Sequence, residues 1–382
     1  MLWRVKIFIR KPFATLVVVI FVAAAILYIE STKPKIEASS QQQNIQLQKN
    51  SLKNQNLQNN PASGELQKII EEKNQKYPAA PDFVGIDKWI NSEPLTMEQL
   101  KGKVVLVDIW TYTCINCIRT LPYLKEWYKK YQDKGFVIIG VHSPEFEFEK
   151  KYENVLKAVN DYQIKYPVAL DNNHATWSVY QNRYWPHKFL IDIDGYIRYD
   201  HIGEGNYDET EKMIQSLLEE RMERLNKINK INQSISKPKE VVEFDYTKIG
   251  TPEIYFGYEF TRGNIGYDNM KPEEIADYKI PPSPLKNYVY LSGKWKNNAD
   301  NIELISNEGS ILLGFHAKNV NIVAGSENQS KAFVFLDNKN ESVSTVKEFK
   351  LYNLANAENY DNHEIKIDIK GKGFKIYTFT FG

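Results

Sequence analysis

The residues of this chain that are best suited to chemistry are its two cysteines, Cys114 and Cys117. On a helix this spacing places the two sulfurs one turn apart, close enough to close a small disulfide ring. The run Val104–Trp110 before them is apolar and β-branched, which predicts a buried strand, and a helix is expected from Cys114 to about Tyr131. A strand that leads into Cys-x-x-Cys at a helix start is typical of a thiol–disulfide site.

The position of each cysteine predicts its role. Cys114 stands at the expected helix N-terminus, where unpaired backbone N–H groups and the helix dipole favour a thiolate, so it is the predicted nucleophile. Cys117, one turn further in, is expected to be more buried and to act as the resolving thiol. Asp108 lies on the preceding strand among apolar neighbours, where a carboxylate is costly, and is the candidate proton acceptor for Cys117. The alternative is an acid that merely has a local hydrogen-bond partner.

Two other uses of a cysteine pair fit this sequence less well. A structural zinc ion needs four ligands, but the chain has no third cysteine and its six histidines are scattered. A purely structural disulfide between residues so near in sequence would close too short a loop to remove much chain entropy. We therefore expect no metal, and no cofactor besides the redox-active Cys114–Cys117 pair.

The motif resembles a known family. A buried acid, a tryptophan, the cysteine pair and a helix proline occur in thioredoxin-fold proteins at the positions held here by Asp108, Trp110, Cys114, Cys117 and Pro122. The string WTYTCINCIRTLPYL is similar to the extracytoplasmic thioredoxin domain of DipZ-type proteins, within the TlpA-like branch. The resemblance runs from about Pro81 to the C-terminus and includes segments 140–150, 166–177 and 182–199. It implies an α/β thioredoxin fold and a protein disulfide oxidoreductase.

The resemblance also implies site residues and partners. Pro186 would be a cis-proline facing the cysteines, and the backbone of Trp185 would pair with a substrate chain. The family implies reduction of disulfides in extracytoplasmic client proteins, with electrons from a membrane thiol carrier of the CcdA kind. Thr113 departs from the aromatic residue usual before the first cysteine. The dipeptide Ile115-Asn116 differs from the Gly-Pro of thioredoxin, so the redox potential does not carry over.

A second strand should end beside the cysteines. Phe136–Val141 is predicted to run parallel to Val104–Trp110, because a helix joins them, and parallel strands end at the same sheet edge. That places His142, Ser143 and Glu145 close to Cys114, where Glu145 or His142 could tune the thiols or contact a partner; ordinary loop polarity is the equal alternative. The residues grouped as substrate contacts are Trp110, Thr113, Glu145 and Trp185. Further along the chain, a helix is expected over 146–164 and a hairpin over Lys188–Ile202.

The N-terminal region predicts a membrane anchor. Phe13–Ile29 is almost entirely apolar and follows four basic residues, so the basic flank should stay in the cytoplasm and the rest should lie outside, in the periplasm or at the cell surface. A cleaved signal peptide is the alternative. Residues 1–30 are thus a single-pass transmembrane anchor with its flank, and residues 31–79 are expected to be a disordered Gln/Asn-rich tether.

The remaining chain divides into two predicted domains. Residues 80–231 form the redox domain, 232–245 a linker, and 246–382 an all-β, jelly-roll-like antiparallel sandwich, because apolar and polar residues alternate between recurrent turn signals. This last part is similar to the C-terminal domain of DipZ-type proteins, which looks like a carbohydrate-binding module. Tyr255, Tyr258 and Trp295 could stack on sugar rings, but packing is the favoured interpretation.

Charge and composition limit the partners. The net charge of +1 gives no case for nucleic acid. We expect a membrane-anchored extracytoplasmic thiol–disulfide oxidoreductase, most plausibly a reductase. One alternative is a thiol peroxidase, since Thr111 stands three residues before Cys114. The other is a protein that binds cell-wall glycan or a partner and has a secondary redox site.

Overall fold

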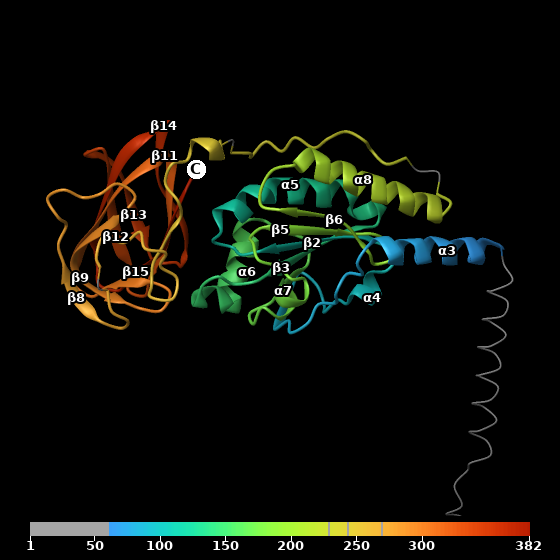
Figure 1. The fold of residues 1–382 in the computed structure, drawn as a ribbon, viewed down its shortest axis with the longest axis horizontal. Helices are drawn as coiled ribbons and strands as arrows, with labels where there is room; N and C mark the ends of the chain where they lie inside the picture. The colour runs from blue at the N-terminus through green and yellow to red at the C-terminus, as the bar shows by residue number, and fades with distance from the viewer. Residues whose placement is uncertain (1–60, 228–229, 243, 269) are drawn as a thin grey trace, which may run out of the picture. The chain divides into compact units, whose positions relative to one another are not determined.

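The computed structural model describes residues 61–382 except 228–229, 243 and 269 (Figure 1). Residues 74–382 form one compact unit. The predicted membrane segment Phe13–Ile29 lies outside the described residues. In the part of the chain that the structure describes, no helix has the length and apolar character needed to cross a membrane.

Residues 61–76, predicted to belong to an unstructured tether, instead form helix α3 (Pro61–Lys76). Leu66, Ile69 and Ile70 recur here at helical spacing, and the Gln67 amide donates a hydrogen bond to Glu71 one turn later, at 3.2 Å. The Gln/Asn-rich composition that indicates disorder ends before this segment, so the tether prediction extended too far along the chain.

A mixed six-stranded sheet forms the first domain, in the order β1-β4-β3-β2-β5-β6. Strands β2, β3 and β4 are parallel, whereas β1, β5 and β6 run antiparallel to their neighbours. The strands are β1 (Lys88–Ile90), β2 (Val104–Trp110), β3 (Phe136–His142), β4 (Val168–Leu170), β5 (His187–Ile191) and β6 (Ile197–Ile202). The predicted strand before the cysteines, the parallel pairing with its neighbour and the later hairpin are all confirmed.

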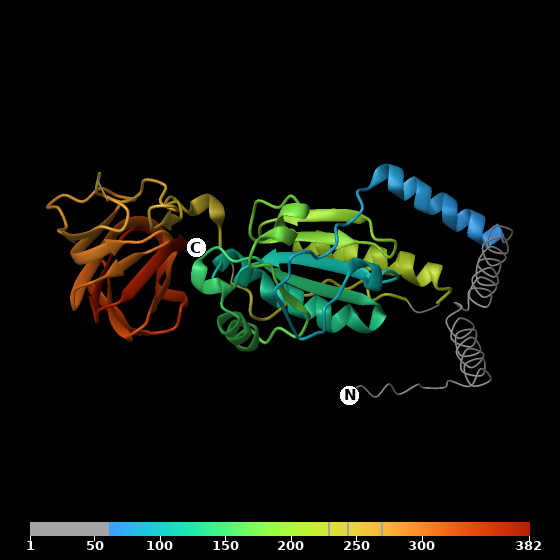
Figure 2. The same ribbon diagram turned by 90° about the horizontal axis from the view of Figure 1, so that it is seen from below.

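Helices cover both faces of this sheet (Figures 1 and 2). They are α4 (Met97–Leu100), α5 (Ile115–Tyr131), α6 (Tyr152–Asp161), α7 (Ala175–Val179) and α8 (Tyr207–Arg224), with short 3₁₀ turns η1 (Gln132–Lys134) and η2 (Glu147–Lys150). The single helix expected over 146–164 is thus split into η2 and α6. Side chains of α5, α6 and α8 pack on one face, and those near α4 and α7 pack on the other.

The period-two alternation of β2 places its side chains in two separate cores. Leu106 and Trp110 pack in the core beneath α5 and α8, whereas Val105 and Val107 pack in the opposite core. Asp108 has the same parity as Leu106 and Trp110, so its carboxylate lies on the face that carries α5. The strand therefore positions an acid beneath the helix that bears both cysteines.

The second domain is a single nine-stranded antiparallel sheet. Its strands, orange to red in Figure 1, are β7 (Ile254–Tyr255), β8 (Ile275–Tyr278), β9 (Val289–Asn297), β10 (Ile302–Leu304), β11 (Glu308–Ser326), β12 (Ser330–Leu336), β13 (Lys339–Val346), β14 (Lys350–Lys370) and β15 (Phe374–Phe381). A 3₁₀ turn, η3 (Tyr246–Lys248), precedes them. The all-β antiparallel prediction is confirmed.

Strand β11 closes this sheet on itself. One of its edges pairs with β9 along the first part of the strand and with β15 along the last part, while β9 and β15 are joined through β10. Register shifts near Ala317 and Val320 mark where β11 bends. The predicted sandwich is therefore realised as one continuous, barrel-like sheet around a single apolar core.

Two of the aromatic residues considered for sugar stacking are packed inside. Trp295 is fully buried and its indole N–H donates to the carbonyl of Ser292 at 2.8 Å, and Tyr255 is also buried. Neither can stack on a ligand in this conformation, so packing is their role. Tyr258 is half-buried.

An aromatic cluster joins the two domains. The rings of Phe146 and Phe148, which flank the start of η2, lie 5.1 and 4.6 Å from that of Tyr377, and Phe148 lies 5.3 Å from Phe349. The Tyr112 hydroxyl donates a hydrogen bond to the backbone carbonyl of Phe349 at 3.1 Å. These residues belong to one continuous core, so the segment after β3 is packed by both domains.

Candidate active site

The cysteine pair opens helix α5. Cys114 is the N-cap residue, and its Sγ accepts a hydrogen bond from the backbone N–H of Cys117 at 3.3 Å. That N–H stabilises negative charge on the sulfur. Cys114 is half-buried and Cys117 is 1% exposed, and both thiols are free. Of the two sulfurs, that of Cys114 is thus the one that can reach and attack the disulfide of another molecule.

The second thiol is held in its protonated form. Burial, followed by the hydrogen bond and charge of Cys114, raises the pKa of Cys117 well above its ordinary value, and the charge of Asp108 raises it further. A resolving cysteine in this state needs a group to accept its proton. Asp108, whose charge acts on Cys117, is therefore the candidate acceptor for this proton.

Asp108 forms a buried pair with Lys188, which sequence reasoning missed. The two residues face each other across β2 and β5, with Asp108 Oδ1 and Lys188 Nζ 3.7 Å apart and each side chain 1% exposed. Neither carboxylate oxygen has a hydrogen-bond partner among the described residues. Burial raises the pKa of Asp108 despite the opposing effect of Lys188. A carboxylate so placed can take up a proton at a pH where an exposed aspartate cannot.

The Trp185–Pro186 peptide bond is cis, as the resemblance implied. His187, the next residue, pairs with Ile109 of β2, so Pro186 lies at the same end of the sheet as the cysteine motif. The Trp185 indole N–H donates to the carbonyl of Ser143 at 2.9 Å, and its ring lies 4.3 Å from that of Trp177. Trp185 is half-buried, which leaves part of it open to a client.

Trp110 and Thr113, predicted to contact substrate, are buried, at 0% and 1% exposed. Their side chains are closed to solvent in this structure, and contact of these two residues with substrate stays a prediction. The Thr113 hydroxyl donates to Glu149 Oε1 at 2.5 Å, and Glu149 Oε2 accepts the backbone N–H groups of Glu145 and Phe146 at 2.6 and 3.0 Å. Glu149, which the sequence did not single out, therefore fixes the residue before Cys114 to the segment after β3.

The loop after β3 lies at the sheet edge that was predicted, but its polar groups turn inward. His142 is fully buried, its pKa is lowered to about 3 by burial, and its Nε2 lies 3.3 Å from the Thr111 hydroxyl. Glu145 is half-buried, and burial followed by the charge of Glu149 raises its pKa to about 8. The other groups that act on Glu145 belong to the second domain: Tyr255, Glu253 and Arg262. Whether Glu145 also tunes the thiols stays a prediction.

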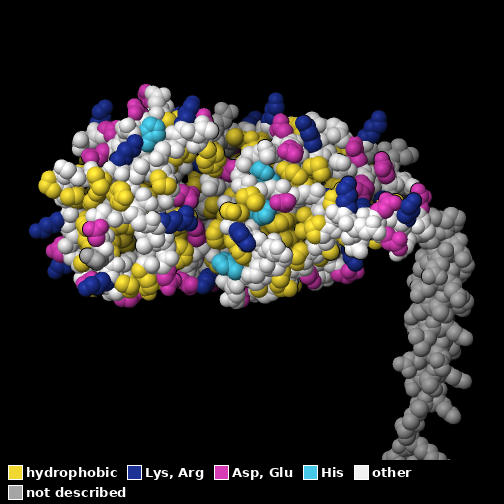
Figure 3. Space-filling model, viewed as in Figure 1, with side chains coloured by type: hydrophobic (Ala, Val, Ile, Leu, Met, Phe, Trp, Pro, Cys, Tyr) yellow, Lys and Arg dark blue, Asp and Glu magenta, His cyan; other side chains and the backbone are white. Residues whose placement is uncertain are grey.

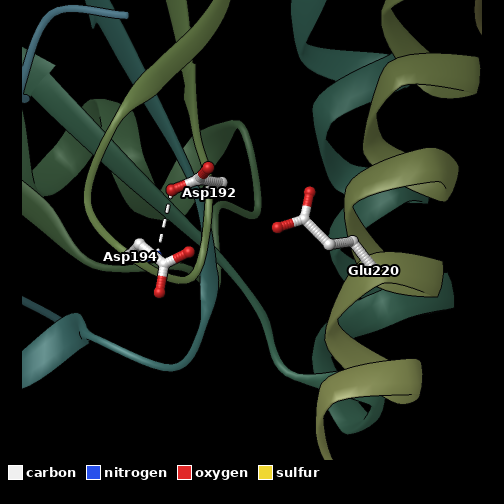
Figure 4. Close-up of side chains that lie close together, drawn as sticks. All are labelled: Asp192, Asp194 and Glu220. Carbon is white, nitrogen blue, oxygen red and sulfur yellow. Dashed lines mark hydrogen bonds between the residues drawn. The ribbon is translucent and has the colours of Figure 1, made fainter. Parts of the chain in front are cut away.

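One group of acidic side chains in the described residues could, by distance alone, hold a cation: Asp192, Asp194 and Glu220 (Figure 4). Arginines already neutralise it. Arg198 Nη1 lies 3.0 Å from both Asp192 Oδ2 and Glu220 Oε2, and Arg224 Nη2 lies 2.7 and 2.6 Å from the two Asp194 oxygens. We interpret the group as an ion-pair network that ties the β5–β6 turn to α8.

Charged side chains on the surface do not gather by sign. On the face drawn in Figure 3, lysine and arginine side chains lie interspersed with aspartate and glutamate. This agrees with the near-neutral total charge.

A sheet of this order, with Cys-x-x-Cys at the N-terminus of the helix after β2 and a cis-proline before β5, defines a thioredoxin-fold dithiol protein. Comparison with known proteins agrees: residues 74–218 match the Redoxin family, and residues 251–382 match the family described as thioredoxin like C-terminal domain.

Two named relatives and one solved structure are similar to this chain. The chain is 35% identical to Protein DipZ of Mycobacterium tuberculosis over 308 residues, covering 79% of this chain and 43% of DipZ. It is 33% identical to thiol-disulfide oxidoreductase ResA of Bacillus cereus over 147 residues, covering 38% of this chain and 81% of ResA. A solved thiol-disulfide isomerase from Corynebacterium glutamicum is 25% identical over 38% of this chain and 97% of its own, with a TM-score of 0.35. The match to ResA, most of whose length this chain covers, shows that the chain belongs to the thioredoxin-like thiol–disulfide oxidoreductases, a family of protein disulfide oxidoreductases. The chain spans less than half the length of DipZ.

Proposed function

We propose that this protein reduces disulfides of extracytoplasmic client proteins through Cys114 and Cys117. The observation that carries the proposal is the contrast between the two sulfurs: one is half-buried at a helix N-cap, and the other is fully buried on the side of the sheet where Asp108 and Lys188 form their pair. Such an arrangement separates the attacking thiolate from the resolving thiol.

The proposed cycle balances as a thiol–disulfide exchange. The Cys114 thiolate attacks one sulfur of the client disulfide, and the other client sulfur leaves as a thiolate. Asp108 accepts the proton of Cys117, which then attacks the Cys114 sulfur and releases the second client thiolate. The client gains two thiols, and Cys114 and Cys117 become a disulfide.

A dithiol donor must then reduce the Cys114–Cys117 disulfide before the next cycle. We propose a membrane thiol carrier of the CcdA kind as the donor and Phe13–Ile29 as a single-pass anchor that holds the redox domain outside the cytoplasm. Contact of the second domain with cell-wall glycan also stays a prediction. Cells that have the carrier should contain this protein with free thiols, and cells without it should contain the oxidised form, as measured by alkylation and gel shift. Protein that is oxidised whether or not the carrier is present would argue for an oxidase.

Trapping a mixed disulfide tests the chemistry directly. Full-length Cys117→Ala should form a covalent adduct with disulfide-bonded protein substrates such as insulin, detected by mass spectrometry and reversed by dithiothreitol. Cys114→Ser/Cys117→Ala is the matched control and should form none. The wild type should cleave insulin disulfides with dithiothreitol as donor. If no adduct forms and insulin stays intact, the proposed function is wrong.

A further inference from the structure

The segment that leads into the second domain crosses the cysteine motif. The Tyr246 hydroxyl donates its one hydrogen to Glu204 Oε1, and Asn116 Oδ1, 3.0 Å away, is a second acceptor within its reach. Asn116 is the second of the two residues between the cysteines. Burial first, and then the charge and hydrogen bond of Glu204 and the charge of Cys114, raise the pKa of Tyr246, which places its hydroxyl in the electrostatic reach of the nucleophile.

A second contact holds the same segment in place. The Arg119 guanidinium lies 3.9 Å over the ring of Phe244, and Arg119 Nη1 lies 3.5 Å from Glu204 Oε1. The Arg119 and Glu204 side chains are only 6% and 3% exposed, so this ion pair is fixed rather than solvated. Segment 244–246 is therefore attached to helix α5 at two points close to Cys114.

Tyr246 also reaches the other side of the site. Glu204 belongs to the turn after β6, where Gly203 and Gly205 have positive φ, and the Gly203 N–H donates to the carbonyl of Pro186 at 2.7 Å. Through Asn116 and Glu204, Tyr246 thus connects the cysteine motif with the loop behind the cis-proline. The proposed mixed disulfide at Cys114 would form beside these two elements.

The ring of Tyr246 is left open although its hydroxyl is fixed. The residue is 51% exposed, and it borders a hollow of about 290 Å³ whose other lining residues are Asn116, Ile249, Thr251, Glu253 and Phe381. A tyrosine held rigid before binding loses little conformational entropy when a partner covers it, and such residues contribute strongly at protein interfaces.

We propose that Tyr246 is a specificity-determining residue, whose exposed ring contacts the polypeptide that flanks the client cysteine in the mixed disulfide. The proposal rests on the proposed function, because it names the surface that selects polypeptide disulfides over small ones. A small aromatic disulfide reaches the Cys114 sulfur with little surface beyond its own sulfurs, whereas a protein client brings its chain against the ring.

The test compares two substrates in the full chain. The second-order rate constant for reaction of the pre-reduced protein with insulin is divided by that for its reaction with a small disulfide, 5,5′-dithiobis(2-nitrobenzoate), in single turnovers without free donor, because dithiothreitol would reduce the small disulfide directly. Tyr246→Ala should lower this ratio about tenfold, as expected for an interface residue worth somewhat over 1 kcal/mol. Tyr246→Phe keeps the ring but loses the hydroxyl and its contacts with Glu204 and Asn116, so it should lower the ratio less, about threefold. Tyr196→Ala, in the turn at the opposite end of β5, is the matched control and should leave the ratio as in the wild type.

Each result decides the question. An unchanged ratio in Tyr246→Ala, or an equal loss with both substrates, overturns the inference, and a ratio that rises would show that the ring obstructs clients. If Tyr246→Ala unfolds, as judged by its thermal transition, Tyr246→Phe carries the test. A wild type inactive on both substrates would instead refute the proposed function.

Discussion

The two domains differ most in what they bury. In the first domain, ionisable side chains lie deep in the interior close to the cysteine motif or on its strands, including Asp108, His142, Glu149 and Lys188. Among the described residues of the second domain, Asp300 is the buried acid, and it accepts a hydrogen bond from the Glu147 N–H of the first domain. Buried charge destabilises a fold unless it is paired. We interpret the buried ionisable groups of the first domain as groups that position the site residues or alter their reactivity. The second domain is built for packing and surface, and the first for chemistry.

The largest effect is expected from removal of the nucleophile. This change tests whether the chemistry lies in the first domain. Cys114→Ser should lower disulfide reduction at least about a thousandfold, because a hydroxyl is a far weaker nucleophile than a thiolate. Insulin reduction with dithiothreitol as donor measures this effect. Its thermal transition should stay close to that of the wild type. Residual activity near the wild-type level would place the chemistry elsewhere in the chain.

A buried carboxylate of the first domain should matter more for stability than an exposed one of the second. Glu149→Ala leaves the Thr113 hydroxyl and two backbone N–H groups without their acceptor, so the free energy of unfolding should fall by about 3 kcal/mol. Glu341→Ala, on exposed strand β13, should change it by less than about 0.5 kcal/mol. Denaturant titration measures both. Equal effects would show that burial does not distinguish the two regions.

The acids between the domains predict a dependence on pH. The folded-state pKa of Glu145 is raised to about 8, above its ordinary value of 4.5, so the stability linked to its protonated form is complete below pH 4.5 and is lost as the pH rises through 8. The Tm of the wild type should fall between pH 5 and pH 9, and the Tm of Glu145→Gln should fall less. Glu147→Gln, its exposed neighbour, should follow the wild type. A Glu145→Gln profile that superimposes on the wild type would contradict this.

The smallest expected effect concerns a single hydrogen bond across the junction. Tyr112→Phe removes the bond to the Phe349 carbonyl and should lower the free energy of unfolding by about 1 kcal/mol. Tyr352→Phe removes a similar bond, to the Glu348 carbonyl at 2.7 Å, within the second domain. If the domains unfold together, both variants should shift one common transition. Two separate transitions, of which only one moves, would sharpen the division between the domains.

Sequence reasoning succeeded where the signal was local. The strand Val104–Trp110, the helix that opens with the cysteines and the hairpin after Pro186 follow from periodicity and turn residues in short windows. The cis bond at Pro186 came only from the resemblance, because an isolated Trp-Pro sequence favours trans.

What failed depended on register or on distant packing. Lys188 pairs with Asp108 only because β5 runs antiparallel beside β2 in one particular register, which no local pattern specifies. Alignment of the predicted hairpin with β2 would have placed Lys188 directly opposite Asp108. Tyr246 meets Asn116 across 130 positions of sequence, and the curling of the second domain depends on β11 changing its neighbour midway.

The aromatic cluster shared by the two domains also limits where the chain can be truncated. A redox fragment that stopped at the 232–245 joint would keep Phe146 and Phe148 but lose Tyr377 and Phe349, the rings that cover them. Large apolar side chains stripped in this way form the kind of patch that drives aggregation. The excised domain would be poorly soluble for reasons unrelated to its thiols, and its behaviour would misrepresent the enzyme.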